Sequence, residues 1–520
     1  MRHQSDNPFS GIRYAVFGCG HSDWSQTFHA IPNEVDRTFS SLGATRLVDM
    51  GTADAAKNQI NGEFEAWEPG LWSAIGDEYG EEHAVQAEEF EIEVKTEARS
   101  VGLRQNVKQA RVIKSERISQ EDAPDERHLE LELPEGMEYR TGKLCRSYDN
   151  CSGVDNNFPG DYLAILPLNP YPTVARVLKH YSLPRDTLIA VKSGRFPGIP
   201  TGSTISLHDL LSGYVELSQP CTRKTAEALA KHVSATASSS PDATDLHNLA
   251  TTDYESQVLS PRISLLDLFE RYSNTLRTFP LASFLQSLPA MRIRSYSISS
   301  SSLASPRIVS LTISVLTAPS VWNTSTRFLG VASNYIATLE AGDTAQVATR
   351  PSHQAFHPPA DVENTPVLML CAGTGIAPFF GFCAERAHLL QSGRELAKGV
   401  LYFGVRREVD VLYAEKLKEW QEMGAVEVRY AFSREAEKTK GCKYVQERMW
   451  EEREELVELF DAGAKVFVCG SSKLGEGVRE VVEKVYAETT EKRGKSKTKE
   501  EVKEWFEGIR NERYAVDVFT

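Results

Sequence analysis

Residues 366–375 read P-V-L-M-L-C-A-G-T-G, and this stretch sets the fold class of the C-terminal part of the chain. Residues 366–370 form an apolar run typical of a buried strand, and an apolar helical stretch follows the glycines. Such a turn lets backbone N–H groups approach a phosphate, although it is often only a tight loop. Strands and helical stretches alternate from here to the C-terminus, which predicts a doubly wound α/β domain.

Two other patterns precede this domain. Alternating apolar and polar residues at 88–135, such as H-L-E-L-E-L, predict antiparallel barrel strands with one exposed side, and strands return at 292–299 and 307–316. Between them, residues 204–290 have helical spacing, interrupted at 233–257 by a stretch rich in Ser, Thr, Ala and Asp that we expect to be a surface loop. A helical insertion therefore splits the barrel.

The N-terminal residues predict part of a parallel sheet. Residues 12–18 are typical of a buried strand, residues 33–42 of a helix, and residues 45–48 of a second strand. A parallel sheet needs more strands than this segment supplies, so we expect the first unit to be incomplete.

Length, charge and cysteine content limit the possible functions. The chain has 520 residues, which at about 150 per domain predicts several domains. The 58 Lys and Arg against 72 Asp and Glu give a net charge of −14, which disfavours nucleic acid and suits a basic protein partner. The cysteines are scattered, so neither a disulfide framework nor a structural metal is indicated. No membrane segment or signal peptide is evident, and we expect a cytoplasmic location.

Short motifs carry the candidate chemistry. The segment R-S-Y-S at residues 294–297 ends a strand, and G-V-A-S-N at residues 330–334 opens a helix. An arginine can neutralise a pyrophosphate, and Gly330 admits backbone N–H groups to the same diphosphate. Tyr296 is suited to packing on a flavin ring, and Ser297 to a hydrogen bond near its reactive nitrogen. Taken alone, each motif also fits an ordinary strand end with a capping arginine.

The pair Ser433 and Arg434 follows a later strand. A hydroxyl and a guanidinium at a parallel-strand end can bind the ribose 2′-phosphate that separates NADP from NAD. Taken alone, the pair is better explained as a bare surface arginine. The order of all the motifs decides between the cofactor-binding interpretation and the ordinary one. The motifs are, in order, R-S-Y-S, G-V-A-S-N, A-G-T-G-I-A-P-F, A-F-S-R, Y-V-Q, V-F-V-C-G and a terminal aromatic residue.

This order resembles the diflavin reductases, the NADPH–cytochrome P-450 reductase family, over roughly residues 90–520. The first residues, with Y-A-V-F-G-C-G-H-S-D-W, resemble the final third of that family's flavodoxin-like FMN domain. The sequence of this segment, and the ending R-Y-A-V-D-V-F, are most similar to the reductase half of self-sufficient fungal bifunctional cytochrome P-450/NADPH-P-450 reductases that hydroxylate fatty acids. The resemblance implies a partial flavodoxin-like α/β unit, an antiparallel β-barrel FAD domain with a helical connecting insertion, and a doubly wound α/β NADP domain like that of ferredoxin-NADP reductase.

The resemblance also implies domain boundaries. They are residues 1–80 for the incomplete FMN unit, 81–203 for the first part of the FAD barrel, 204–290 for the connecting domain, 291–360 for the second part of the barrel and 361–520 for the NADP domain. Within the barrel, the family pattern Y-x-x-G-D-x-L is split by an insertion at about residues 143–160. We interpret it as a translated intron, with a tolerated surface loop as the alternative.

The resemblance assigns residues to each cofactor. FAD would be held by Arg294, Tyr296, Ser297, Thr312, Ile313, Ser314, Gly330, Val331, Ala332, Ser333 and Phe519. NADPH would be held by Thr374, Arg406, Ser433, Arg434, Lys443, Tyr444 and Gln446. Ser297, Cys469 and Asp517 match the family's hydride-transfer trio, with a buried strand-end thiol as the alternative for Cys469.

Several positions depart from the family pattern. Trp24 matches an aromatic residue that stacks on FMN, but no phosphate-binding loop precedes residue 12, so we expect weak or no FMN binding. Phe519 stands where the family usually has a tryptophan stacked on the flavin. Further departures, which soften the expected NADP contacts, fall at Cys371, Ala372, Val405, Cys442 and Ser471. Arg434 still favours NADPH over NADH.

The implied activity is hydride transfer from NADPH to FAD, with electrons passing on to FMN or to a haem-protein acceptor, such as a cytochrome P-450-type domain or a cytochrome c-like protein. The chain carries no haem-domain sequence, so we do not expect it to hydroxylate a substrate by itself. The alternatives are a single-flavin NADPH diaphorase without an FMN relay and a non-functional fragment of a bifunctional monooxygenase-reductase. Sulfite reductase and nitric-oxide synthase reductase halves share the FAD and NADP motifs, but the N-terminal sequence argues against them.

Overall fold

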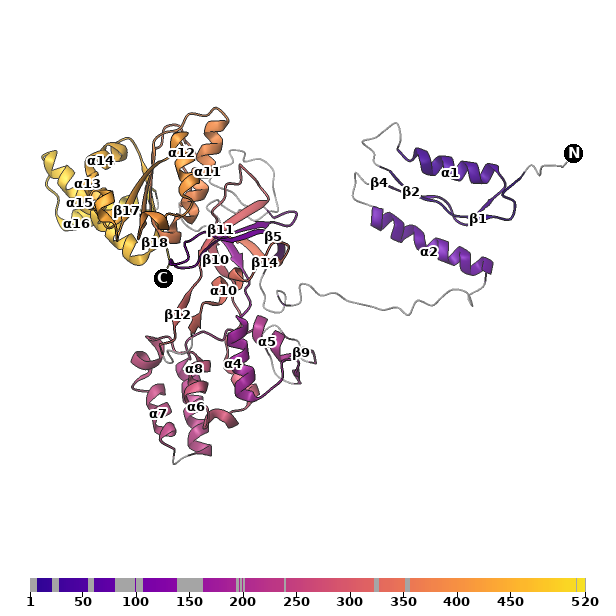
Figure 1. Cartoon of the computed structure of the whole chain (residues 1–520), viewed down its shortest axis with the longest axis horizontal. Coiled ribbons are helices and arrows are strands. Elements are labelled where there is room, and N and C mark those ends of the chain that lie inside the picture. Colours follow the sequence, from indigo (N-terminus) through magenta and orange to yellow (C-terminus); the bar gives the residue numbers. More distant parts are fainter. Residues whose placement is uncertain are drawn as a thin grey trace. The chain divides into compact units, whose positions relative to one another are not determined.

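The computed structural model describes residues 7–20, 28–54, 60–79, 99, 106–137, 162–192, 196, 199, 202–237, 240–321, 327–350, 356–510 and 512–519. The chain divides into two compact units, Met1–Lys95 and Thr96–Thr520 (Figure 1). Trp24 and the insertion predicted at about residues 143–160 lie outside the described residues.

The described residues of the first unit form short parallel strand pairs and two helices. The elements are β1 (Arg13–Tyr14), β2 (Phe17–Gly20), α1 (Ala30–Ser41), β3 (Thr45–Arg46), β4 (Gly51–Asp54) and α2 (Ile60–Tyr79). β1 pairs with β3 and β2 pairs with β4, both in parallel. The strand predicted at residues 12–18 is thus divided between β1 and β2, and the helix predicted at residues 33–42 begins earlier, at Ala30.

An antiparallel barrel opens the second unit. Its strands are β5 (Lys108–Arg117), β6 (Glu126–Glu132), β7 (Tyr162–Ile165), β10 (Arg294–Ser297), β11 (Ile308–Ser314) and β14 (Thr344–Arg350), in the order β10-β7-β14-β5-β6-β11. A bridge between Ile298 and Leu311 joins the two edge strands and closes the sheet. The H-L-E-L-E-L alternation predicted this burial, since Leu129 and Leu131 are fully buried in the barrel core.

A helical body lies between the two parts of the barrel. It contains α4 (Tyr171–Tyr181), α5 (Leu207–Gly213), α6 (Arg223–Thr236), α7 (Pro241–Ala250), α8 (Leu265–Arg271) and α9 (Leu281–Ser287), with the short hairpin β8 (Leu188–Ala190) and β9 (Thr204–Ser206). Its apolar core includes Val174 and Leu178 of α4, so this body begins before the boundary expected at residue 204.

The surface loop predicted at residues 233–257 is wrong. Those residues include the end of α6, all of α7, and the first part of a π-helical turn at Tyr254–Leu259. Leu246 and Leu249 of α7 are fully buried in the helical core. Ser240 caps α7 through its side-chain oxygen, which accepts from the N–H of Asp242. The helix was not predicted because most of its residues are polar. Two leucines are nevertheless enough to bury one face of it.

A parallel sheet forms the C-terminal part. Its strands are β15 (Val367–Ala372), β16 (Gly399–Val405), β17 (Glu427–Phe432), β18 (Lys465–Ser471) and β19 (Tyr514–Phe519), in the order β17-β16-β15-β18-β19. The helices α11 (Ala377–Gln391) and α12 (Ala414–Glu422) cover one face, and α13 (Val445–Glu451), α14 (Arg453–Asp461), α15 (Ser472–Lys492) and α16 (Lys499–Ile509) cover the other (Figure 1). The doubly wound α/β prediction is confirmed.

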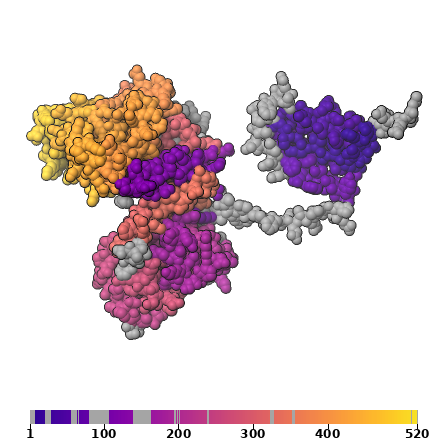
Figure 2. All heavy atoms as spheres, in the orientation of Figure 1, coloured from indigo at the N-terminus to yellow at the C-terminus, as the bar shows by residue number. Residues whose placement is uncertain are grey.

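The β5–β6 hairpin packs against this α/β part. In Figure 2 the purple hairpin lies directly on the orange surface of the chain. A hydrogen bond of 2.9 Å joins Nδ1 of His128 to the hydroxyl group of Tyr413, and the guanidinium of Arg407 pairs with Asp122 at 2.8 Å. These contacts hold the barrel against the parallel sheet.

The predicted fold class is confirmed as a whole: a flavodoxin-like remnant, an antiparallel barrel with a helical insertion, and a doubly wound α/β domain. No helix among the described residues is both long enough and apolar enough to cross a membrane.

Candidate functional site

Strand ends from the barrel and from the parallel sheet meet at one carboxylate. Asp517 of β19 is the register partner of Cys469 on β18. The hydroxyl group of Ser297, at the end of β10, donates to Oδ2 of Asp517 at 2.8 Å. The three residues that the sequence grouped as a hydride-transfer trio therefore lie together, although their roles stay a prediction.

Tyr162 contributes a second hydroxyl group to the same carboxylate. It is the first residue of β7 and the register partner of Ser297, and its hydroxyl donates to Oδ1 of Asp517 at 3.1 Å. No sequence motif assigned a role to Tyr162. The only signal was its place directly after Gly160 and Asp161, where the interrupted family pattern resumes. Both oxygens of Asp517 are thus held by hydroxyl groups from the barrel.

Cys469 is buried, with 1% of its surface exposed. Burial raises the pKa of its thiol well above the usual value, and the nearby Asp517 carboxylate acts in the same direction. The thiol is therefore protonated at neutral pH, which excludes an activated thiolate nucleophile. Its side chain belongs to the apolar core that packs against α11.

Gly375 brings the phosphate turn close to this cluster. It lies in the 3-10 turn Gly373–Ile376, which joins β15 to α11. A Cβ atom at Gly375 would lie only 2.3 Å from the carbonyl oxygen of Cys469. Only glycine permits this approach, so the turn fixes the spacing between β15 and β18 at their carboxyl ends.

A cavity of about 310 Å³ opens at the carboxyl ends of β15, β16 and β17. Among the residues that line it are five that the sequence proposed for NADPH: Arg406, Ser433, Lys443, Tyr444 and Gln446. Gly373 and Pro124 line it as well, so the barrel supplies part of the wall. Ligands of open α/β sheets bind at this end of the strands.

One polar atom indicates that the cavity fits a polar ligand. In the described part of the chain, Oε1 of Gln446 is buried without a hydrogen-bond partner. A buried acceptor of this kind costs free energy unless a ligand or water satisfies it. Of the other residues proposed for NADPH, Arg434 follows Ser433 and donates its backbone N–H to the carbonyl oxygen of Arg406, and Thr374 lies beside Gly373 in the turn.

The proposed FAD arginine is already partly paired. Nη2 of Arg294 donates to Oε1 of Glu216 at 2.8 Å, and Glu216 has 1% of its surface exposed. The second oxygen of Glu216 is buried without a partner among the described residues. Arg294 is itself only partly exposed. Glu216 therefore fixes the orientation of the guanidinium, which would present its remaining edge to a diphosphate.

The other residues proposed for FAD occupy the barrel rim and its core. Gly330 caps α10 (Val331–Ala337), and Oγ of Ser333 accepts from the N–H of Leu316 at 3.0 Å. Val331, Ala332, Ser333 and Ile313 are buried, whereas Ser314 is exposed. Tyr296 is partly buried against the barrel core, and burial raises the pKa of its hydroxyl group.

Thr312 and Phe519 differ from the other residues proposed for FAD. The hydroxyl group of Thr312 lies 2.7 Å from that of Tyr413, so it joins the barrel to the α/β part and does not point to an open site. The backbone of Phe519 pairs with Ser471 at the end of β19, and its side chain lies outside the described residues.

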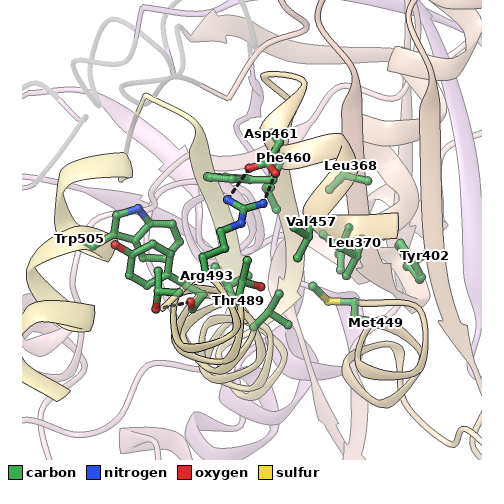
Figure 3. Close-up of a pocket in the computed structure, with 16 residues that line it drawn as sticks. Leu368, Leu370, Tyr402, Met449, Val457, Phe460, Asp461, Thr489, Arg493 and Trp505 are labelled. Carbon is green, nitrogen blue, oxygen red and sulfur yellow. Dashed lines mark hydrogen bonds and ion pairs between the residues drawn. The ribbon is translucent and has the colours of Figure 1, made fainter. Parts of the chain in front are cut away.

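A second cavity, of about 130 Å³, lies under α14, α15 and α16 (Figure 3). Its wall is mostly apolar, with Leu368, Leu370 and Val457 pointing inward, and the rings of Tyr486 and Trp505 stack 3.6 Å apart at one side. The charged groups Arg493 and Asp461 pair with each other. Its charged groups are thus paired with each other, and the mostly apolar wall identifies the cavity as a space in the packing of the helices.

Three family models match parts of the chain. The FAD binding domain matches residues 150–335, the oxidoreductase NAD-binding domain matches residues 369–480, and flavodoxin matches residues 1–67. The chain thus contains an FAD-binding and an NAD-binding domain, preceded by part of a flavodoxin domain.

Curated relatives match along nearly the whole chain. A bifunctional cytochrome P450/NADPH–P450 reductase of Fusarium oxysporum is 42% identical over 100% of this chain and 46% of its own length. A self-sufficient cytochrome P450 monooxygenase of Phanerodontia chrysosporium is 43% identical over 99% of this chain and 46% of its own length. A bifunctional protein of Acremonium egyptiacum is 37% identical over 98% and 45%. The chain spans about half the length of the curated relatives it matches.

Proposed function

We propose that the chain is a diflavin reductase that corresponds to the reductase half of fungal bifunctional cytochrome P450/NADPH–P450 reductases, and that it reduces a haem protein with electrons from NADPH. The observation that carries the proposal is the meeting of Ser297, Cys469 and Asp517 where the FAD-binding barrel touches the NAD-binding sheet. A flavin held by the barrel and a nicotinamide held by the sheet could come into contact here.

The residues of the cluster have separate tasks in this proposal. A bound FAD would supply the acceptor for the hydride of NADPH and a means of passing the two electrons on singly. The Asp517 carboxylate offers a fixed negative charge beside the nicotinamide as that ring becomes cationic. Ser297 and Tyr162 hold this carboxylate in place, and the neutral Cys469 thiol fills the space between the strands without adding a charge.

The dinucleotide would lie along the carboxyl edge of the sheet. Its diphosphate would meet the backbone N–H groups of the turn that begins at Gly373, and Ser433, Arg434 and Lys443 would surround its ribose 2′-phosphate. Gln446, with its unpaired buried oxygen, would bind a polar group of the same ligand. The guanidinium of Arg434 favours NADPH over NADH.

A haem protein is the proposed acceptor. The names of the relatives join a cytochrome P450 to the reductase, and the net charge of −14 suits a partner with a basic surface. We also propose a cytoplasmic location, because the cysteines of the described residues are free thiols, as expected in a reducing compartment.

Flavin content and acceptor choice test the proposal together. The purified chain should be yellow, NADPH should bleach the flavin within seconds, and ferricyanide should be reduced; reduction of cytochrome c as well would support a haem-protein acceptor. Ferricyanide reduction without cytochrome c reduction would leave the narrower activity of a single-flavin NADPH diaphorase. Folded protein that takes up no FAD would contradict both activities.

A further inference from the structure

A carboxyl group lines the dinucleotide cavity although the cavity would hold an anionic ligand. It belongs to Glu126, the first residue of β6, which reaches from the barrel into the wall of the cavity. A Cβ atom placed on Gly373 would lie 3.8 Å from Oε1 of Glu126. The carboxyl group therefore faces the turn whose backbone N–H groups would meet the diphosphate in the proposed site.

The two nearby arginines, Arg406 and Arg407, are paired with other acids. Arg406 pairs with Asp410 at 3.6 Å, and Arg407 pairs with Asp410 and with Asp122, both at 2.8 Å. Among the described residues, Glu126 has no ion pair of its own. The positive charge of Arg406, which favours the ionised form of Glu126, is thus shared with the Asp410 carboxylate in the same cavity.

The surroundings of Glu126 favour the neutral acid. Partial burial raises its pKa to about 7, the Asp410 carboxylate acts in the same direction, and the Arg406 guanidinium opposes both. The charged and titratable groups around it are Arg406, Asp410, Tyr413, Lys443 and Tyr444 of the α/β part and Asp122, Asp125 and Arg127 beside it on the barrel.

We infer that Glu126 is a further residue of the dinucleotide site, which binds the coenzyme diphosphate as a protonated acid and so couples coenzyme binding to proton uptake. The inference rests on the proposed function. A protonated carboxyl group donates a hydrogen bond to a phosphate oxygen, whereas the carboxylate only accepts and repels the phosphate. Coenzyme affinity therefore falls as the pH rises through about 7. The loss arises from the contact with the diphosphate and not from the contact with the 2′-phosphate.

Proton uptake on binding tests this without any turnover. The FAD-loaded chain is titrated calorimetrically with NADP⁺ at pH 7, in two buffers of different ionisation enthalpy, and the same is done with 2′-AMP, which has the 2′-phosphate but no diphosphate. Phosphate ionisation near pH 6 affects both ligands, so the contribution of Glu126 is the difference between them. We expect NADP⁺ to take up about half a proton more than 2′-AMP, and its Kd to rise about fivefold from pH 6.5 to 8.

Variants separate Glu126 from other acids. E126Q should bind NADP⁺ with the proton uptake of 2′-AMP and with a Kd that changes little above pH 7. The matched control E132Q alters a carboxylate on the same strand that pairs with Arg307, and it should behave as the unaltered chain. Equal proton uptake for NADP⁺ and 2′-AMP in the unaltered chain would overturn the inference while leaving the proposed function intact. A chain that binds neither 2′-AMP nor NADP⁺ would overturn the proposed function as well.

Discussion

The hydroxyl group of Ser297 donates to the carboxylate of Asp517 at 2.8 Å, although the two residues lie 220 positions apart. One belongs to the barrel and the other to the last strand of the parallel sheet. The bond therefore exists only when both domains are folded and in contact. Any ring bound beside it is held by two domains at once, which is what a transfer between two cofactors requires.

Replacing Asp517 by Asn should slow flavin reduction by about 10²-fold, because the fixed negative charge beside the nicotinamide is lost. FAD content should stay unchanged, since the amide still accepts from Ser297. Stopped-flow absorbance of the flavin after mixing with NADPH measures the rate. An unchanged rate would remove Asp517 from the hydride-transfer cluster.

Tyr162→Phe should slow the same step by about 5-fold, because one of two hydroxyl donors to Asp517 is lost and a hydrogen bond is worth roughly 1 kcal/mol. The KM for NADPH should not change, since Tyr162 lies outside the dinucleotide cavity. Tyr14→Phe is the matched control: it removes a tyrosine hydroxyl bonded to Asp36 in the first unit. Equal effects of the two variants, or an effect on KM alone, would argue against a positioning role.

Arg434→Ala should raise the KM for NADPH by about 10- to 100-fold, the loss expected when one charged hydrogen bond to a phosphate is removed. The KM for NADH should change much less, because NADH has no 2′-phosphate. Steady-state ferricyanide reduction with each coenzyme gives both values. Arg394→Ala, which breaks an exposed pair with Glu363, should leave the ratio of the two KM values as it was.

Gly375→Ala should destabilise the α/β part by about 2–3 kcal/mol and reduce hydride transfer, because the new methyl group would collide with the carbonyl oxygen of Cys469. Gly508→Ala is the control within the same domain: its Cβ meets nothing within 4 Å, and alanine in a helix should raise stability by up to about 1 kcal/mol. Denaturant unfolding measures both variants. Equal stabilities would show that β15 and β18 can move apart freely.

Glu126→Gln should stabilise the protein at pH 8 and have little effect near pH 4. A carboxyl group whose pKa rises to about 7 on folding holds its proton in the folded state while the unfolded chain has already lost it. Stability therefore falls as the pH rises from the unfolded pKa, near 4.5, to about 7, and the amide removes this loss. We expect a gain of about 1–2 kcal/mol after allowance for partial exposure, measured by denaturant unfolding across this pH range.

The FMN to FAD ratio of the purified chain should be well below one. The described residues of the first unit form only pairs of parallel strands, which do not make the continuous sheet that a flavodoxin site needs. Flavins released by heat and separated by chromatography give the ratio. A ratio near one would contradict the expectation.

Local patterns were sufficient for most of the architecture. The G-T-G turn after an apolar strand predicted the parallel sheet, and the alternation at H-L-E-L-E-L predicted buried leucines in the barrel, because both signals depend on neighbouring residues. The helix α7 escaped prediction since its mostly polar stretch carries only two large apolar side chains, Leu246 and Leu249, beside small alanines. Its burial depends on partners elsewhere in the helical core, and no local pattern records them.

The site divides in the same way. The family resemblance was enough to group Ser297, Cys469 and Asp517, but the place of Tyr162 beside Asp517 and of Glu126 beside the phosphate turn came only from the folded chain. A motif records which residue types follow one another along the chain. Hydrogen bonds between β7 and β19, and the burial of a carboxyl group between a barrel and a sheet, join segments hundreds of residues apart, so only tertiary packing decides them.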